Sequence, residues 1–512
     1  MRKPKNTLLR ALQRSTVANI NPENQKITTR RDFLTTTTKA GLLVAASAYI
    51  PFLTSCQSKH NKPKIVILGA GIAGLTAAYN LKKAGLSNTD VQIYDSLKRV
   101  GGRIHTDATF IPGLTMEIGG EFIDTDHTEM LNLAKEFKLD LKDNKTDSLN
   151  KDTSAEWYCI AGKRYTEEEV IKEFNHYAPL IKSDREAAGE KWDTLNALKL
   201  DNMSVEEYFD RIKLSGWLRE LLNVAYLSEL GLPLAEQSAI NFIGLINSDT
   251  KNGFKIFGDS DERFSIKGGN SKVIESLAEN VSPVNLDHHL EAVKSKGDGF
   301  TLTFNGNKEV YADFVINTIP FKVLREVKMD IDMPAKKKKA IDELGYGNNA
   351  KLFLGFKERI WRTKYQNPGY SFNENIHNGW DNSWMQNNNE GPAGYTIYLG
   401  GGEAVTLAEN KKDKKKMAEK YLPMLDHVYP GLKEQWSGEA EIAWWPVSKA
   451  IKGSYSAYKV GQYSSISGHE IEPVGNMLFA GEHCSTDFQG FMNGGAETGK
   501  KAASDLIKLL NG

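Results

Sequence analysis

Short apolar runs alternate with longer periodic segments along this chain, and the alternation predicts an α/β protein. Residues 65–68 are uniformly apolar and lead through a glycine-rich turn into a helical pattern at 74–84 and a second strand at 91–95. A strand, helix and strand in this order form a βαβ unit with parallel strands. Near the other end, residues 476–483 predict a buried strand and residues 494–510 a helix that completes the unit.

Two further kinds of segment interrupt this unit. Residues 128–237 place apolar side chains at helical spacing, as in M-L-N-L-A-K-E-F, and predict a helical insertion. Residues 327–445 contain strand-like runs at 351–356 and 395–399 around a polar loop rich in asparagine, and they predict a mixed sheet. Between the two, residues 238–326 return to loop, helix and strand and belong with the first unit.

The charge balance differs between the leader and the rest of the chain. The 512 residues have no net charge, but residues 1–55 contain nine Lys and Arg against two acids. The remainder therefore carries seven more acids than bases, which excludes the basic footprint of a nucleic-acid-binding protein.

The leader resembles an export signal. It contains T-T-R-R-D-F-L at 28–34, an apolar stretch at 40–53 and L-T-S-C at 53–56. The first motif is similar to a twin-arginine signal and the last to a lipobox. The resemblance implies that residues 1–55 are removed, that Cys56 receives a lipid and that residues 56–63 form a stalk, so that the protein is periplasmic or at the cell surface. An uncleaved anchor helix is the alternative, and it also implies export.

The remaining cysteines and histidines do not predict a metal site. Cys159 and Cys484 are far apart, and the ten histidines show no His-x-x-x-His spacing. His288 and His289 are interpreted as a pair at a strand edge. The lysine runs Lys336–Lys339 and Lys411–Lys416 are interpreted as solvated helix faces.

The glycines of G-A-G-I-A-G at 69–74 have separate roles in a dinucleotide-binding turn. Gly69 makes the tight turn, Gly71 admits a pyrophosphate to the backbone, and Gly74 allows close packing of helix on strand. Asp95 ends the second strand, where a carboxylate can accept hydrogen bonds from a ribose. A glycine-rich turn in an unrelated α/β protein is the alternative.

Together with the glycine turn at 69–74, four later motifs resemble those of the flavin-containing amine oxidases. This family includes monoamine, polyamine and L-amino-acid oxidases. They are V-G-G-R at 100–103, E-I-G-G-E-F-I-D at 117–124, G-N-N-A-K-L-F-L-G-F at 347–356, and F-A-G-E-H at 479–483 with G-F-M-N-G-G-A-E-T-G at 490–499. The likeness covers residues 64 to about 508. One departure is Asp95, where the family usually has Glu.

The resemblance implies a Rossmann-like FAD-binding domain of the amine oxidase type, interleaved with a mixed-sheet substrate domain and a helical insertion. The FAD-binding parts would be residues 64–127, 238–326 and 446–512, with substrate-domain parts at 128–237 and 327–445. The implied FAD-binding residues are Gly69, Ala70, Gly71, Ala73, Gly74, Asp95, Gly102, Arg103, Gly119, Gly120, Glu121, Phe122, Leu290, Gly481, Glu482, Gly490, Phe491 and Met492.

The resemblance also assigns residues to the reaction. Lys351 matches the lysine that the family holds beside flavin N5 through a water; a strand-edge lysine facing solvent is the alternative. Ser454 stands where monoamine oxidases have the cysteine that bonds to flavin, which implies noncovalent FAD. Tyr455 and Phe491 match two aromatics that flank the substrate amine, unless they are core packing. Trp444 and Trp445 are further candidates for the pocket wall.

The implied activity is oxidation of a primary amine or L-amino acid to an imine, with dioxygen reduced to hydrogen peroxide. The sequence does not choose between the two substrates. An amino acid needs a cation for its carboxylate, which Arg263 or Arg362 could supply. One alternative is a flavoprotein dehydrogenase or desaturase that passes electrons to a quinone or a protein. The other is a lipid-anchored protein that only retains FAD.

Overall fold

The structure, a computed structural model, describes residues 62–86, 90–146, 156–386 and 389–511. The predicted signal, residues 1–55, lies outside the described residues, as do Cys56 and most of the predicted stalk. Within the described ranges, no helix combines the length and the apolar character that crossing a membrane requires.

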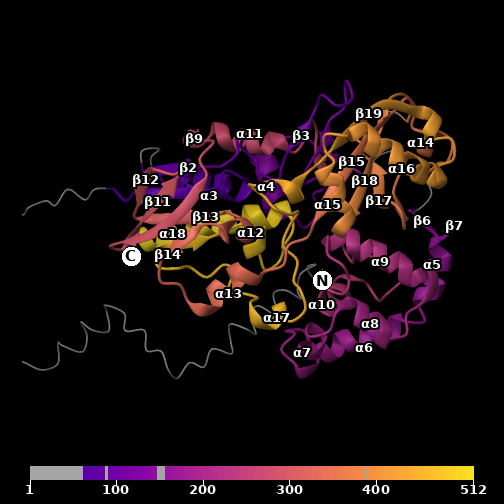
Figure 1. Cartoon of the computed structure of the whole chain (residues 1–512), viewed down its shortest axis with the longest axis horizontal. Coiled ribbons are helices and arrows are strands. Elements are labelled where there is room, and N and C mark those ends of the chain that lie inside the picture. The colour runs from indigo at the N-terminus through magenta and orange to yellow at the C-terminus, as the bar shows by residue number, and fades with distance from the viewer. Residues whose placement is uncertain (1–61, 87–89, 147–155, 387–388, 512) are drawn as a thin grey trace, which may run out of the picture.

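A five-stranded parallel sheet lies at the centre of the predicted cofactor domain. Its strands, in spatial order, are β20 (Met477–Phe479), β13 (Phe314–Asn317), β1 (Ile65–Leu68), β2 (Val91–Tyr94) and β9 (Val284–Asn285). The first and last described helices, α3 (Ile72–Lys83) and α18 (Met492–Asn511), pack against each other beside this sheet (Figure 1). Segments from both ends of the chain therefore build one domain, as the sequence predicts.

A four-stranded sheet and two small ribbons surround this core. The four-stranded sheet has the order β12 (Lys308–Ala312), β11 (Gly299–Phe304), β10 (Leu290–Lys296) and β14 (Lys328–Asp330). The ribbons pair β3 (Thr106–Asp107) with β4 (Met116–Glu117), and β5 (Leu141–Asp143) with β8 (Phe264–Ile266).

A seven-stranded mixed sheet forms the second layer of the molecule. Its order is β19 (Trp436–Ile442), β15 (Asn349–Phe356), β18 (Ala393–Gly400), β17 (His377–Asp381), β16 (Ser371–Asn373), β6 (Trp157–Ile160) and β7 (Lys163–Tyr165). The neighbours pair antiparallel except β16 and β6, which are parallel. Every residue of β15 is buried, because the strand has neighbours on both sides and packed faces.

Helices cover the sheets and fill the lower right of Figure 1. Those of the predicted insertion are α4 (Thr128–Glu136), α5 (Glu167–Phe174), α6 (Ala178–Ala188), α7 (Leu195–Asp201), α8 (Val205–Arg211) and α9 (Gly216–Leu230). The others are α10 (Ala239–Leu245), α11 (Ser271–Glu279), α12 (Phe321–Leu324), α13 (Ala335–Glu343), α14 (Ile360–Thr363), α15 (Gly401–Glu409), α16 (Lys414–Val428) and α17 (Gln462–Ser465), with short 3₁₀ turns at Lys433–Gln435, Trp445–Val447 and Glu482–Cys484.

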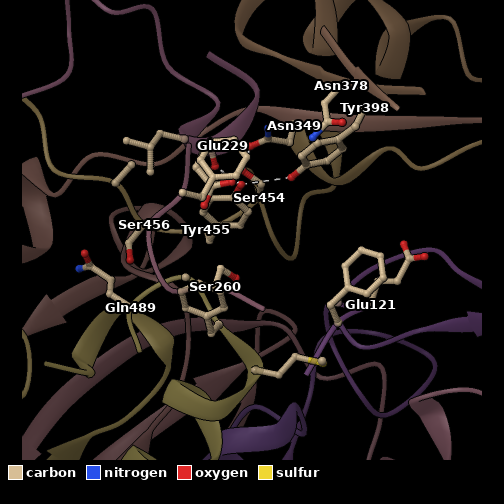
Figure 2. A pocket seen from close by; sticks show the side chains of 18 of the residues that line it. Glu121, Glu229, Ser260, Asn349, Asn378, Tyr398, Ser454, Tyr455, Ser456 and Gln489 are labelled. Atoms are coloured by element: carbon tan, nitrogen blue, oxygen red, sulfur yellow. Dashed lines mark hydrogen bonds between the residues drawn. The ribbon is translucent and has the colours of Figure 1, made fainter. Parts of the chain in front are cut away.

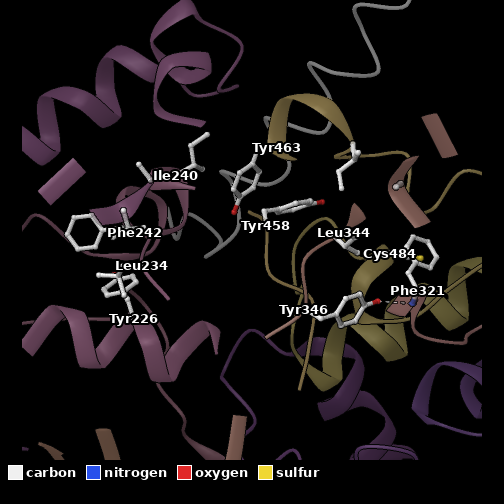
Figure 3. Packing of buried hydrophobic residues seen from close by; sticks show 14 of the residues in the cluster. Tyr226, Leu234, Ile240, Phe242, Phe321, Leu344, Tyr346, Tyr458, Tyr463 and Cys484 are labelled. Atoms are coloured by element: carbon white, nitrogen blue, oxygen red, sulfur yellow. Dashed lines mark hydrogen bonds between the residues drawn. The ribbon is translucent and has the colours of Figure 1, made fainter. Parts of the chain in front are cut away.

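One continuous hydrophobic cluster joins the helical insertion to the cofactor domain. Phe242 of α10 packs edge to face on Tyr226 of α9, and Phe321 packs on Phe479 of the parallel sheet. Figure 3 shows Tyr458 and Tyr463 between these two groups. Because the cluster spans segments that are far apart in sequence, it fixes the helical insertion relative to the flavin-binding motifs.

Two local expectations differ from the structure. Strands β6 and β7 lie within residues 128–237, where periodicity predicts helix; they add to the edge of a sheet formed elsewhere, so local pattern does not reveal them. Lys337 does not face solvent. It lies one turn before Ala340 and Ile341 on the buried face of α13, and its Nζ donates to the Glu470 carbonyl. Burial lowers the pKa of Lys337 to about 8.

Candidate active site

Two adjoining cavities run between the parallel sheet and the mixed sheet. The first, named here the glycine-loop cavity, has a volume of about 190 Å³ and lies at the carboxyl ends of β1 and β2. The second, the aromatic cavity, has a volume of about 290 Å³ and lies against β15, β17 and β18. Six residues line both cavities: Arg103, Gly120, Ser454, Gly490, Phe491 and Met492.

The glycine turn has the geometry that its sequence predicts. Gly69 has a φ of +103°, and a Cβ there would lie 2.3 Å from the Thr318 hydroxyl. A Cβ on Gly74 would lie 1.9 Å from the Gly69 carbonyl oxygen, so only glycine allows the helix so close to the strand. Gly71 is the N-cap of α3 and faces open space at the cavity. Backbone amides at a helix N-terminus next to open space fit a pyrophosphate.

Asp95 lies beside this turn and fixes its shape. One carboxylate oxygen accepts from the Ala70 amide and the other from the Leu97 amide, both at 2.7 Å. Burial raises the pKa of this carboxyl, although the two amides oppose the effect. Each oxygen keeps a second lone pair that can accept from a ribose hydroxyl. Leu290, predicted as a contact, lines the same cavity near the stacked rings of Tyr94 and Phe304.

Arg103 and Glu482 join the two cavities. Arg103 Nη1 donates to Glu482 Oε1 at 2.9 Å and to the Ser454 carbonyl at 2.7 Å. Glu482 Oε2 accepts from the Ser456 hydroxyl at 2.7 Å and from the Gly490 amide at 2.9 Å. Burial acts to raise the pKa of Glu482, but Arg103, His483 and the Ser456 hydroxyl together outweigh it and the pKa is lowered. The glycine turn, the acid and this arginine together fit FAD.

Lys351 is buried on β15 and donates to three oxygens of the segment 117–121. Its Nζ lies 2.9 Å from the Glu117 carbonyl, 2.8 Å from the Gly119 carbonyl and 2.9 Å from Glu121 Oε2. The side chain is 8% exposed, so the alternative of a solvent-facing lysine is wrong. The side chains of Lys351 and Glu121 line the aromatic cavity, as do Gly119 and Phe122.

The aromatic cavity contains the predicted rings and others that the sequence does not indicate. Tyr455, Phe491 and Trp445 line it. Tyr455 donates to the Glu229 carbonyl, and its hydroxyl lies 3.2 Å from that of Tyr398. Figure 2 shows Tyr455 and Tyr398 side by side in the cavity. Tyr398 and Trp380 project from β18 and β17, and their rings pack at 5.3 Å. The pairing of β17 with β18, rather than a sequence motif, brings these two rings to the site.

Three other predicted pocket residues lie elsewhere. Trp444 does not line either cavity; it is 39% exposed and Lys411 lies 3.6 Å from its ring centroid. Arg263 binds Asp143 through two nitrogens. Arg362 binds the buried Asp381, which Arg359 also contacts. The two arginines lower the pKa of Asp381 to about 2, against the effect of burial.

The aromatic cavity is acidic where an amino-acid substrate would need a cation. Among the described residues, its lining cations are Arg103 and Lys351, and each binds a glutamate. Its lining acids are Glu121, Asp124, Glu229 and Glu262. Asp124 also lies within 4.8 Å of Asp126 and His127 through potential ligand atoms, a group that the sequence did not suggest. Asp124 accepts hydrogen bonds from the Ser260 hydroxyl and the Glu262 amide.

Comparisons with known proteins identify the family. A sequence model described as flavin containing amine oxidoreductase matches residues 72–507, and the chain belongs to this family. The protein is therefore a flavin-dependent enzyme that acts on CH–NH₂ groups and uses FAD. Ser454 cannot form a thioether, and neither Cys159 nor Cys484 lines a cavity, so no described cysteine is placed to bond to the flavin.

The relatives are distant but cover most of the chain. Amine oxidase [flavin-containing] A of Equus caballus is 23% identical over 474 residues, 87% of this chain and 85% of that protein. Polyamine oxidase 4 of Oryza sativa subsp. japonica is 24% identical over 477 residues, which are 88% of this chain and 89% of that protein. Among solved structures, putrescine oxidase bound to putrescine has a TM-score of 0.72 at 21% identity over 87% of this chain and 99% of that one. Cyclohexylamine oxidase from Brevibacterium oxydans has a TM-score of 0.74 at 20% identity, over 88% of this chain and 100% of that one.

Proposed function

We propose that the protein oxidises primary amines rather than L-amino acids and passes the electrons to dioxygen, which is released as hydrogen peroxide. The charge of the aromatic cavity is the observation that carries this choice. A substrate carboxylate would meet three further lining acids, Asp124, Glu229 and Glu262, and two cations that already bind glutamates. A substrate ammonium, in contrast, would be attracted toward the cavity.

The same cavity suits the chemistry of the neutral amine. Part of its wall is aromatic, and burial against these rings opposes the charge that the acids attract, so it favours the uncharged form of an amine that is about to react. The ring faces of Tyr455 and Phe491 would orient the amine. Tyr455 is fixed for this role because its hydroxyl bonds to the Glu229 carbonyl and to Tyr398. When bound, FAD would supply the oxidation by accepting the hydrogen of the carbon next to nitrogen together with its two bonding electrons. Hydrolysis of the imine then gives a carbonyl compound and ammonia.

The printed names of the relatives support an amine substrate. They include amine oxidases and polyamine oxidases, and one related structure contains putrescine. These substrates belong to those proteins, and the cavity charge is the reason to extend the substrate class to this chain.

Anaerobic reduction of the flavin tests the substrate assignment. The FAD-loaded protein is mixed with a panel of aliphatic and aromatic monoamines, diamines and L-amino acids, and bleaching near 450 nm is followed. We expect an amine to bleach the flavin and L-amino acids to leave it oxidised; bleaching only by amino acids would overturn the proposal. Admission of dioxygen should then restore the colour with stoichiometric peroxide. Reoxidation only by a quinone would instead indicate a dehydrogenase.

We also propose that the leader exports the enzyme and that Cys56 anchors it to a membrane. The support is the sequence alone: the twin arginines Arg30 and Arg31, the apolar stretch and the lipobox-like residues 53–56. The double substitution Arg30→Lys with Arg31→Lys should retain the protein in the cytoplasm. Cys56→Ala should abolish incorporation of labelled palmitate but leave the twin-arginine motif intact. Palmitate labelling of the Cys56→Ala protein would refute the anchor.

A further inference from the structure

All three N–H donors of the Lys351 ammonium point to protein oxygens. The acceptors are the carbonyls of Glu117 and Gly119 and the carboxylate of Glu121. An ammonium has three donors and no acceptor. In this arrangement a water or a flavin atom can accept a hydrogen bond from Lys351 only if one of the three existing bonds breaks. The family resemblance, which implies a lysine that donates to a water, does not anticipate this saturation.

Glu121 is held from two sides. Its Oε2 accepts from Lys351 at 2.9 Å and its Oε1 accepts from Trp380 Nε1 at 3.0 Å. The carboxylate side chain is 5% exposed, and the Trp380 ring centroid also lies 5.4 Å from Lys351 Nζ. Glu121 is therefore fixed by β17 as well as by β15. A buried ion pair with this geometry leaves a costly unpaired charge when either partner is removed.

A carboxylate is not needed merely to hold the lysine. Two backbone carbonyls already accept from it, and a neutral amide at position 121 would supply a third acceptor. The carboxylate adds a negative charge next to Lys351 in a site where water screening is weak, so the pair presents almost no net charge to the cavity. A lone buried ammonium would stabilise negative charge on a nearby flavin and would repel a cationic substrate.

We propose that Glu121 is a positioning residue that fixes Lys351 and cancels its charge, and so lowers the reduction potential of the flavin while admitting cationic amines. The inference rests on the proposed function, because the family resemblance alone places Lys351 beside the flavin ring. Failure of the inference can be told apart from failure of the proposed function, since a reduction potential is measured without any substrate.

The test compares Glu121→Gln with wild type in the FAD-loaded protein. The amide oxygen keeps the acceptor for Lys351 and the charge is removed, while the amide nitrogen faces the Trp380 Nε1 donor and that bond is lost. We expect the flavin potential to rise, and sulfite, which forms an anionic flavin adduct, to bind at least ~10-fold more tightly. The KM for a cationic amine should rise as well. An unchanged potential and sulfite affinity in a fully loaded Glu121→Gln protein would overturn the proposal, whatever happens to amine turnover.

Two further variants separate charge from packing. Trp380→Phe removes the other hydrogen bond to Glu121 but keeps both charges, so the potential should stay at the wild-type value while kcat falls. In a Lys351→Met background the buried Glu121 has lost its countercharge and should take up a proton, so Glu121→Gln should no longer raise the potential. An equal rise in that background would refute the coupling. If Glu121→Gln does not fold, Glu121→Asp, which keeps the charge, should fold and retain the wild-type potential; a raised potential in Glu121→Asp would count against the proposal.

Discussion

Arg103 and Glu482 form an ion pair at 2.9 Å across 379 positions of sequence, at the junction of the two cavities. Glu482 is 7% exposed, and it also binds the hydroxyl of Ser456 and the amide of Gly490. The pair therefore fastens the loop after the first βαβ unit to the carboxyl-terminal motif. Both segments line the glycine-loop cavity.

Removing the charge of Glu482 should weaken FAD binding. Glu482→Gln leaves Arg103 beside a neutral partner and loosens the Gly490 loop, so we expect the Kd for FAD to rise at least ~10-fold, which corresponds to about 1.4 kcal/mol. The Kd is measured by titration of apoprotein with FAD, and the flavin-to-protein absorbance ratio is an independent check. Glu439→Gln, on an exposed position of β19, is the control. Equal Kd values for the two variants would contradict the role of the pair.

Lys351→Met should retain FAD and lose most turnover. The expected loss in kcat is about 100-fold, because the variant removes the ammonium that the family resemblance places beside flavin N5 and that holds residues 117–121 through three hydrogen bonds. The variant also leaves Glu121 buried without its partner, so its Tm should fall by several degrees. Lys351→Met combined with Glu121→Gln should recover the Tm and not the turnover. Lys357→Met, an exposed lysine just after β15, is the matched control; normal peroxide production by Lys351→Met would remove the residue from the reaction.

Acid denaturation should release all of the FAD. By the family resemblance, Ser454 occupies the position at which monoamine oxidases form a thioether, and its hydroxyl donates to Asn349 Oδ1 at 2.6 Å. The buried Cys484 donates its thiol to the Glu470 carbonyl and lines neither cavity. The supernatant after acid precipitation should contain FAD equimolar with the protein, for wild type and for Ser454→Ala alike. Flavin fluorescence that stays with the protein band on a denaturing gel would disprove noncovalent binding.

Local motifs account for what the sequence predicted well. The glycine turn of residues 69–74 follows from steric rules that apply to any chain, and the structure places Gly69 and Gly74 where a side chain would collide. Lys351 lies in a contiguous apolar run, which indicates a buried strand. Such features need no knowledge of distant segments.

The features that the sequence missed depend on contacts between distant segments. Trp380 and Tyr398 reach the aromatic cavity through the pairing of β17 with β18, and neither belongs to a motif. The partner of Lys351 in the ion pair is Glu121, 230 positions away. Arg263 and Arg362 were candidate carboxylate ligands by residue type alone, and the fold gives both of them aspartate partners. Charge pairing of this kind cannot be inferred from spacing.

Glu117 should make the stability of the enzyme depend on pH. Its side chain is buried beside Thr106 and the Asn270 amide, and burial, with a contribution from Glu121, raises its pKa to about 8 from an ordinary value near 4.5. Between these two values the folded state holds a proton that the unfolded state has lost. The contribution of Glu117 to stability is therefore complete below about pH 4.5 and is lost as the pH rises through 8, by an amount on the order of a few kcal/mol.

Glu117→Gln stays neutral at every pH and should not show this loss. We expect the Tm of the variant, minus that of wild type, to increase from about pH 5 to about pH 8 and then to level off, when both proteins are loaded with FAD. Glu309→Gln, on an exposed position of β12, should show no such trend. The comparison isolates one carboxyl, because all other titrating groups are common to the two proteins. A Tm difference that is constant across this range, or that shrinks as the pH rises, would show that Glu117 ionises normally in the folded enzyme.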